Sequence, residues 1–337
     1  MQLKLRHVAA AAAAITLVAL APAGQAGAQA PDKNDGIATV DGFKPGKAVA
    51  APGEIGTRSA SSGASSGDFT GDHAFDILAR QADNGTLKVY PHSRAFDGIR
   101  TYRPAVPINY GWSGFRWIGQ GRINGDALAD VISIDQDGTM RVCPHSGNFN
   151  GTATLAPQSV VGYGWNVNDL VAFGDLTGDG FDDIVARGAG TDYAYLYEHS
   201  GVLDGLNTFK APITILEGVR NTVEINLADI TLDGYLDVLY LEPADTLGVF
   251  SFVDGPVDEN GNTPGMQWDL GYGWSTLNAI TVSEVNGDGY PDVLGRRRNG
   301  ELVVYPHSPT WNANNPLATL QSPVLLGYGW NTNNVIS

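Results

Sequence analysis

The segment DLTGDGFDD, residues 175–183, is the clearest copy of an acidic loop that recurs along this 337-residue chain. The other copies are DFTGDHAFD (68–76), RINGDALAD (122–130), DITLDGYLD (229–237) and EVNGDGYPD (284–292). Their central carboxylates, Asp72, Asp126, Asp179, Asp233 and Asp288, are 54, 53, 54 and 55 residues apart. Such a fixed interval indicates one supersecondary unit that buries its apolar face against neighbouring copies.

Each repeat is predicted to form four short antiparallel strands. In the third repeat, apolar residues 170–173 precede the acidic loop and apolar residues 184–186 follow it. A third strand is TDYAYLYEHS, ending at Ser200, and a fourth precedes the GYGW that ends at Trp165. Short apolar runs separated by tight Gly/Asp loops, without a helical period, predict an all-β chain whose repeats are β-propeller blades.

The two ends of the repeat region are complementary. After the GYGW that ends at Trp330, the segment NTNNVIS matches the first strand of a repeat, whereas the first acidic loop lacks a convincing strand before it. We therefore expect the C-terminal strand to complete the first blade, because closure leaves no open sheet edge between the ends. The prediction is a β-propeller of five four-stranded blades over residues 66–337.

Residues 1–30 combine a basic start, an apolar run and a final Ala-Gln-Ala, the pattern of a secretory signal peptide. The apolar run is shorter than the ~20 residues that a spanning helix needs, which disfavours the alternative of an uncleaved membrane anchor. Residues 31–65 are rich in Gly, Ala, Ser and Pro and are expected to be a flexible lead-in. We expect a secreted, extracellular monomer without a membrane span.

Composition excludes one class of partner. The chain has 20 Lys plus Arg against 36 Asp plus Glu, a formal charge of −16. Such an acidic surface repels phosphate backbones, so nucleic acid is not expected as a partner. Cys143 is the single cysteine and occupies a position that is Tyr in other repeats, so we expect a buried apolar thiol rather than a reactive one.

The acidic loops carry the strongest chemical signal. Counted as positions one to nine, they place oxygen-bearing side chains at one, three, five and nine, with Gly at four or six. Alternate positions along a tightly turning backbone point to one centre, and an all-oxygen set without sulfur or imidazole favours calcium. The competing interpretation is that these Asp residues only form turns through bonds to their own backbone.

This arrangement resembles the loop of FG-GAP (VCBS) repeats, found in the integrin α-subunit propeller and in many secreted bacterial proteins. The resemblance implies about four calcium sites, formed by Asp68, Thr70, Asp72 and Asp76; by Asp175, Thr177, Asp179 and Asp183; by Asp229, Thr231, Asp233 and Asp237; and by Glu284, Asn286, Asp288 and Asp292. In the second loop position one is Arg122, a permanent cation that we expect to lie among Asn124, Asp126 and Asp130. That loop is therefore expected to be metal-free.

The GYGW segments place an aromatic pair at four blade junctions: Tyr110 with Trp112, Tyr163 with Trp165, Tyr272 with Trp274, and Tyr328 with Trp330. The remaining junction reads LEGVRN, with Val219 in place of Trp. Two interpretations stay open for these rings. They are wedges between adjacent blades, or they are exposed rings that stack on sugars.

Two further residue types recur. His92, His145, His199 and His307 end the third strands on the face of the acidic loops. Equivalent positions diverge around a wheel, so we interpret these residues as satisfied structural histidines rather than a zinc or catalytic cluster. Arg80, Arg187 and Arg296, each four residues after a ninth loop position, either anchor the acidic loops or form an anion-binding ring.

The GYGW and YPHS segments also look like the non-catalytic FG-GAP modules attached to secreted actinobacterial enzymes that act on cell walls. This likeness implies a calcium-stabilised module that binds glycans or cell-wall and cell-surface polymers. The alternative is a polysaccharide lyase or hydrolase, built on non-repeated residues such as Arg296 to Arg298, Glu217 with Arg220, or the insert near Trp268. No nucleophile, base and orienting group can be assembled from these. A protein-binding adhesin is a third possibility, without a sharp marker in the sequence.

Overall fold

The computed structural model describes residues 36–40, 43–47, 67–255 and 264–337. The expected signal peptide, most of the expected lead-in and part of the insert before Trp268 lie outside these residues. The described chain contains β-strands and short 3-10 turns and no α-helix. Over the same residues, none of the helical turns has the length and apolar character of a membrane-spanning segment.

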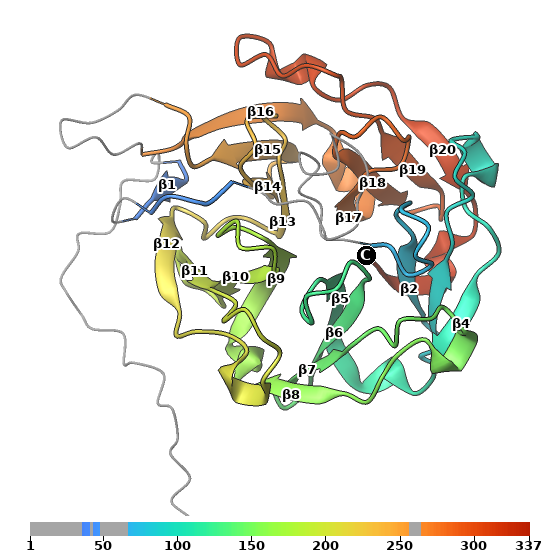
Figure 1. Cartoon of the computed structure of the whole chain (residues 1–337). Coiled ribbons are helices and arrows are strands. Elements are labelled where there is room, and N and C mark those ends of the chain that lie inside the picture. The colour runs from blue at the N-terminus through green and yellow to red at the C-terminus, as the bar shows by residue number, and fades with distance from the viewer. Residues whose placement is uncertain (1–35, 41–42, 48–66, 256–263) are drawn as a thin grey trace, which may run out of the picture. The chain divides into compact units, whose positions relative to one another are not determined.

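Five antiparallel sheets surround a central axis (Figure 1). The first blade contains β2 (Ile77–Gln81), β3 (Leu87–Tyr90) and β4 (Val106–Asn109), and the second contains β5 (Phe115–Gly121), β6 (Asp130–Asp135), β7 (Met140–Cys143) and β8 (Ser159–Gly162). The third contains β9 (Asn168–Gly174), β10 (Asp183–Gly188), β11 (Tyr193–Tyr197) and β12 (Ile213–Glu217). The fourth contains β13 (Glu224–Ala228), β14 (Asp237–Leu241), β15 (Thr246–Ser251) and β16 (Met266–Tyr272), and the fifth β17 (Leu277–Ser283), β18 (Asp292–Arg297), β19 (Leu302–Tyr305) and β20 (Val324–Gly327). The predicted five-bladed β-propeller is confirmed.

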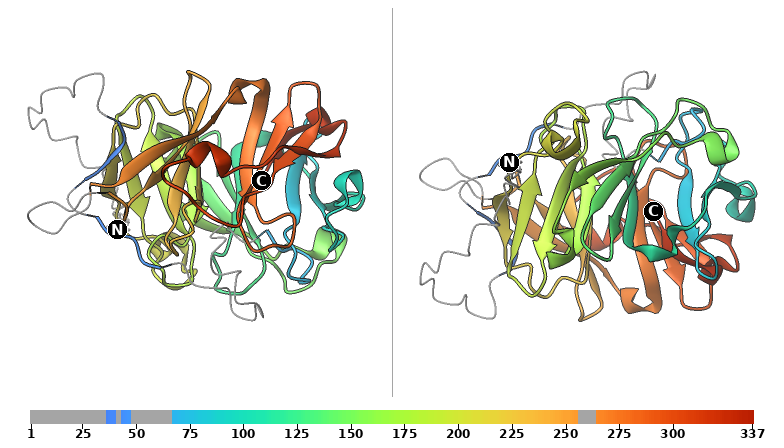
Figure 2. Two further views of the ribbon diagram at one scale, coloured as in Figure 1. Left: turned by 90° about the horizontal axis from the view of Figure 1, so that it is seen from above. Right: turned by 90° about the horizontal axis from the view of Figure 1, so that it is seen from below.

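The ring closes as the sequence predicted. The C-terminal strand β21 (Asn333–Ile336) is the inner strand of the first blade and pairs with β2, with Ala79 opposite Ile336. Leu78 and Ser337 exchange two backbone hydrogen bonds of 2.9 Å each. Both views in Figure 2, taken from the rim, show the strands running between the two faces of the ring.

The hydrophobic core lies between blades rather than within them. One cluster joins Leu78 and Leu87 of the first blade to Ile118 and Val131 of the second, with Trp112 at the junction. Each fully buried Leu or Val stabilises the fold by about 1.5–3 kcal/mol. A blade without its neighbours would expose one side of such a cluster, so the blades depend on one another.

Four blades also extend a 3-10 turn onto the blade before them. These turns are η1 (Gly98–Arg100), η3 (Gly151–Ala153), η5 (Gly205–Asn207) and η7 (Pro316–Ala318), and they pack against β20, β4, β8 and β16 respectively. Each turn thus covers the outer strand of the preceding blade. The described residues of the fourth blade contain no such turn, and β12 is covered differently.

Two stretches of the expected lead-in belong to the folded ring. The short strand β1 (Ala38–Thr39) adds antiparallel to the outer edge of β12, which gives the third blade a fifth strand. Phe43 packs on Phe252 of the fourth blade, with ring centroids 5.4 Å apart. Residues 36–40 and 43–47 therefore have defined contacts, which composition alone did not indicate.

Candidate functional site

The acidic loops lie on one face of the ring, where each joins the first two strands of its blade. The carboxylate at position nine closes each loop. In the first loop, Asp76 Oδ2 accepts the backbone N–H groups of Phe69 and Thr70 at 2.9 Å each, and Oδ1 accepts the N–H of His92 at 2.7 Å. The third strand is therefore attached to the acidic loop of its own blade through a buried carboxylate.

Positions one and five also bind the backbone of their own loop. Asp175 accepts the N–H groups of Asp179 and Gly180, each at 2.9 Å, and Asp179 accepts the N–H of Phe181 at 3.0 Å. These aspartates thus form turns through hydrogen bonds to their own backbone. This bonding leaves some oxygens over: Thr70 Oγ1, Thr177 Oγ1 and Asp233 Oδ2 are buried without a hydrogen-bond partner. All three belong to the ligand positions predicted for calcium.

Burial makes these carboxylates hard to ionise without a counter-charge. It raises the pKa of Asp76, Asp130, Asp183, Asp229 and Asp292 to about 7. At Asp229 the nearby Asp233 raises the pKa further. A bound divalent cation would favour the ionised form of such groups.

The donor set fits calcium in chemistry, although its geometry is not preformed. Among the described residues, no three His, Cys, Asp or Glu side chains already converge as a metal-binding group. A cation at these loops would therefore draw carboxylate oxygens away from backbone N–H groups. The unpaired threonine and aspartate oxygens would complete its shell without such an exchange.

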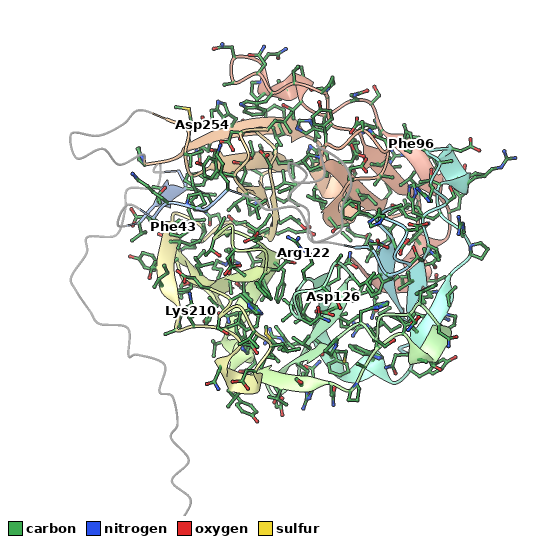
Figure 3. All side chains as sticks on the ribbon, in the orientation of Figure 1. Phe43, Phe96, Arg122, Asp126, Lys210 and Asp254 are labelled. Atoms are coloured by element: carbon green, nitrogen blue, oxygen red, sulfur yellow. The ribbon has the colours of Figure 1, made fainter. Side chains whose placement is uncertain are left out.

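The second loop differs from what we expected. Arg122 does not lie among Asn124, Asp126 and Asp130: its Nε lies 3.6 Å from Oδ1 of Asp182, and its backbone N–H donates to Oδ2 of Asp182 at 2.8 Å. Figure 3 labels Arg122 and Asp126 at separate places on the second blade. Asp182 occupies position eight of the third loop, where the other loops have Phe75, Ala129, Leu236 and Pro291. The long side chain crosses to the next blade because that blade supplies a buried carboxylate.

Two of the four histidines on this face, His92 and His307, have partners at Nε2, whereas the Nε2 atoms of His145 and His199 are buried without a hydrogen-bond partner. His92 Nε2 lies 3.0 Å from the carbonyl oxygen of Val285, and His307 Nε2 lies 2.9 Å from that of Ile230. A carbonyl only accepts, so both Nε2 atoms carry the proton. Burial lowers the pKa of all four histidines, which favours the neutral ring. His92 and His307 each join one blade to the acidic loop of the preceding blade.

The GYGW segments lie on the opposite face, and the structure separates their two aromatic residues. The four Trp side chains, Trp112, Trp165, Trp274 and Trp330, are only 4–7% exposed. The four Tyr side chains, Tyr110, Tyr163, Tyr272 and Tyr328, are 62–68% exposed. Trp is thus the wedge between blades, whereas Tyr faces solvent at four equivalent positions.

The intervening glycine explains this separation. Gly164 has a φ of 77°, a left-handed conformation that glycine adopts at little cost, and it turns the backbone between Tyr163 and Trp165. The buried ring then packs on the third strand of the next blade, with Trp165 and Tyr197 centroids 4.6 Å apart. The Gly between the two aromatic residues was a sequence signal that could have indicated that one ring is buried and the other exposed.

Cys143 occupies the position of Tyr197 in the second blade and is buried, as expected. Cys143 offers no ring for Trp112 to pack on. At this junction Trp112 packs against Phe115 instead, with ring centroids 4.7 Å apart. Burial raises the pKa of the Cys143 thiol to about 11. The thiol is therefore a packing group.

The repeated arginines anchor the turns that lead into the next blade, two of them GYGW turns and one the LEGVRN turn, rather than the acidic loops. Arg80 Nη1 donates to the carbonyl oxygens of Trp112 at 3.0 Å and Phe115 at 2.6 Å, and its Nε donates to Asn334 at 2.9 Å. Arg187 and Arg296 make the corresponding contacts to the next blade. All three side chains are buried. They lie at the far end of the strand from the acidic loop, so neither expectation for them holds.

Comparison with protein families identifies the repeat in part of this chain. A family model described as FG-GAP-like repeat matches residues 122–186 and 175–240. No curated protein matches this sequence. Among solved structures, the chain is similar to an Agrocybe aegerita lectin that recognises non-reducing terminal N-acetylglucosamine, at 19% identity and a TM-score of 0.39. The match covers 78% of this chain and 65% of the lectin chain, so less than two thirds of that protein is spanned.

Proposed function

Because this chain is a β-propeller of FG-GAP repeats, we propose that it is an extracellular, non-catalytic module that binds glycans or cell-surface polymers. Its contact surface is the face of the four GYGW turns. Calcium in the acidic loops of the opposite face stabilises the ring. Membrane insertion and nucleic-acid binding are not part of this function.

The observation that carries the proposal is the repeated exposure of Tyr110, Tyr163, Tyr272 and Tyr328. A tyrosine ring offers a rigid, amphipathic surface that loses little conformational entropy on binding. The apolar face of a sugar ring can stack on it, while the phenol and nearby amides bind hydroxyl groups. The backbone at each tyrosine is fixed in position, because the Trp two residues later is buried in the core.

The spacing of these rings suits a polymer or a dense glycan surface. Four equivalent positions around one face allow several weak contacts to act together, which raises overall affinity without any new contact. An isolated monosaccharide would engage one ring at a time. We therefore expect weak binding of small sugars and much tighter binding of repetitive polymers.

Two of the residues considered for catalysis, Arg296 and Trp268, have side-chain contacts within the fold, which supports the binding function over the enzyme alternative. Arg296 is buried and donates to Asn278 Oδ1 at 2.7 Å. The backbone of Glu217 lies opposite Ala38 in the pairing of β12 with β1, and its side chain is exposed. Trp268 packs edge-on against Trp311, with centroids 5.2 Å apart.

The calcium part of the proposal rests on the loop oxygens. Calcium would be held at the first, third, fourth and fifth loops by the side chains at positions one, three, five and nine, where it would neutralise buried carboxylates. Extracellular modules typically bind calcium at about 10⁻⁴ to 10⁻³ M, which suits permanent occupancy outside cells. The second loop, with Arg122 at position one, would take no calcium.

A glycan and polysaccharide array tests the proposal, run with calcium and with chelator. We expect the wild-type protein to retain one class of polymer, and the variant carrying Tyr→Ala at residues 110, 163, 272 and 328 to lose at least ten-fold in affinity. Tyr193→Ala, which removes a partly exposed tyrosine outside the GYGW turns, is the matched control and should bind normally. Unchanged binding by the quadruple variant would refute the surface, and depolymerisation of any polysaccharide would refute a non-catalytic role.

A further inference from the structure

The junction of the third and fourth blades departs from the repeat in three ways. Its outer strand, β12, receives no 3-10 turn from the described residues of the fourth blade. Val219 takes the place of the wedge Trp, and Phe252 takes the place of the histidine that ends the third strand elsewhere. The first two departures each remove a contact that the other four junctions use, and the third removes the histidine that the other four blades have.

Residues 36–40 supply the missing cover of the sheet edge. Ala38 lies opposite Glu217 and Thr39 opposite Leu216, and the N–H of Val40 donates to the carbonyl of Ile215 at 3.0 Å. The same segment reaches the fourth blade, where the N–H of Thr39 donates to the carbonyl of Pro264 at 3.1 Å. It therefore spans two blades, as the 3-10 turns do elsewhere.

Residues 43–47 supply the missing contacts near the acidic loops. Phe43, which is labelled in Figure 3, packs against Phe252, the residue at the histidine position, with an angle of 75° between the ring planes. The N–H of Gly46 donates to the carbonyl of Leu176 in the third loop at 2.9 Å. Lys47 pairs with Tyr235 of the fourth loop, and its amine lies 5.5 Å from the centre of the Tyr235 ring.

We propose that this junction is a docking surface for extended peptide segments, and that its occupants are residues 36–40 and 43–47 of the same chain. Ladder hydrogen bonds to β12 provide affinity, and the contact of Phe43 with Phe252 fixes the register. Among the described residues, β12 is the one outer strand that receives no 3-10 turn, and the docked segment covers its edge. Without it, the edge of β12 is a template for pairing with the same edge of a second copy.

The fifth turn shows why the occupant is the chain itself. Gly218 corresponds to the turn glycines of GYGW and has a φ of 83°. A Cβ at Gly218 would lie 2.5 Å from the carbonyl oxygen of Gly36, whereas a Cβ at Gly111, Gly164, Gly273 or Gly329 would meet nothing within 4 Å. The four GYGW turns are open, and the fifth is closed by residues 36–40. This inference stands independently of the ligand proposed for the tyrosines.

The difference between these glycines provides a matched pair of variants. Gly218→Ala and Gly164→Ala impose similar backbone strain, because φ is 83° and 77°, but only Gly218→Ala collides with the segment. Phe43→Ala is a second variant, which removes the aromatic contact without touching a turn. Hydrogen exchange of the amides of Val40 and Gly46 reports docking, and light scattering after gel filtration reports the oligomeric state.

We expect both amides to be protected in the full-length wild-type protein and in Gly164→Ala, with both proteins monomeric. Gly218→Ala and Phe43→Ala should lose at least ten-fold in protection at both amides and form a concentration-dependent dimer. Equal protection in Gly218→Ala and Gly164→Ala, or free exchange in the wild type, would overturn the docking. Loss of protection with no dimer at any concentration would overturn the sealing role, and a wild-type dimer would overturn docking within one chain.

Discussion

The ring centroids of Trp330 and Tyr90 lie 4.3 Å apart across the seam where the two ends of the propeller meet. The same Trp and Tyr pairing holds two internal junctions, between Trp165 and Tyr197 and between Trp274 and Tyr305, at 4.6 Å each. The closing junction is therefore built like the others, although it joins residues 240 positions apart. Its strength should set the stability of the whole ring, because opening it frees β21.

Truncating the wedge at the seam tests this relationship. Trp330→Ala removes a buried ring from the core and should lower the free energy of unfolding by about 3–5 kcal/mol. Tyr328→Ala, two residues earlier and exposed, is the control and should change it by less than about 0.5 kcal/mol. Denaturant unfolding of both variants measures the difference, and similar destabilisation by both would contradict the assignment of wedge and surface residues.

The buried pair of Arg122 and Asp182 supports a second prediction. Arg122→Ala leaves the carboxylate of Asp182 buried without its cation and should cost about 3–5 kcal/mol of unfolding free energy. Adding Asp182→Leu, which restores the residue type found at position eight of the fourth loop, should recover most of that loss. Denaturant unfolding of the single and double variants completes the cycle. If the double variant were less stable than Arg122→Ala, with the two losses adding, the two residues would not act as a pair.

Calcium should stabilise the protein more at high pH than at low pH. Ligands whose pKa is raised to about 7, such as Asp229, must release protons before they bind a cation. At calcium concentrations about 100-fold above the dissociation constant, each site should add about 2.7 kcal/mol of stability. We expect the difference in melting temperature between calcium and EDTA to grow from pH 6 to pH 8, and a pH-independent difference would count against these loops as the site.

Asp233→Asn separates the two roles of one loop carboxylate. In EDTA the change removes the charge that raises the pKa of Asp229, so it should raise the melting temperature slightly. In calcium the change removes a ligand, so the rise in melting temperature that calcium produces should shrink by the contribution of one site. Asp126→Asn in the second loop is the control and should leave the calcium gain intact. If Asp233→Asn shifted the melting temperature in the same direction in calcium and in EDTA, a metal role for Asp233 would be contradicted.

In EDTA the loop carboxylates should make stability fall as pH rises from 6.5 to 8. A folded-state pKa raised above the unfolded value means that the folded protein holds more protons. This contribution is complete below about pH 4 and is lost as pH rises through about 7. The histidines act in the opposite sense below about pH 6.5, because burial lowers the pKa of each, so the upper window isolates the carboxylates. Calorimetric scans across it, at constant ionic strength, measure the slope.

Much of the architecture follows from local sequence. The interval between Asp72, Asp126, Asp179, Asp233 and Asp288 indicates equivalent blades, and NTNNVIS indicates the strand that closes them. These predictions succeed because strand length, turn chemistry and repeat period are local properties. The oxygen pattern of the loops is local in the same way, so the candidate metal ligands could be named before any contact was known.

Contacts between blades required the tertiary structure. From the sequence alone, Tyr and Trp of GYGW were expected to be both buried or both exposed. Arg122 was expected in its own loop, and Arg80 was expected near the acidic loop rather than at the opposite end of its strand. Each outcome depends on which neighbour a side chain meets across a junction, and residues that meet there are tens to hundreds of positions apart. The sequence by itself determined the number of blades and their order, because those follow from a short repeated pattern. Only the tertiary structure decided which rings face solvent and how residues 38–40 cover β12, because burial is a property of the assembled ring.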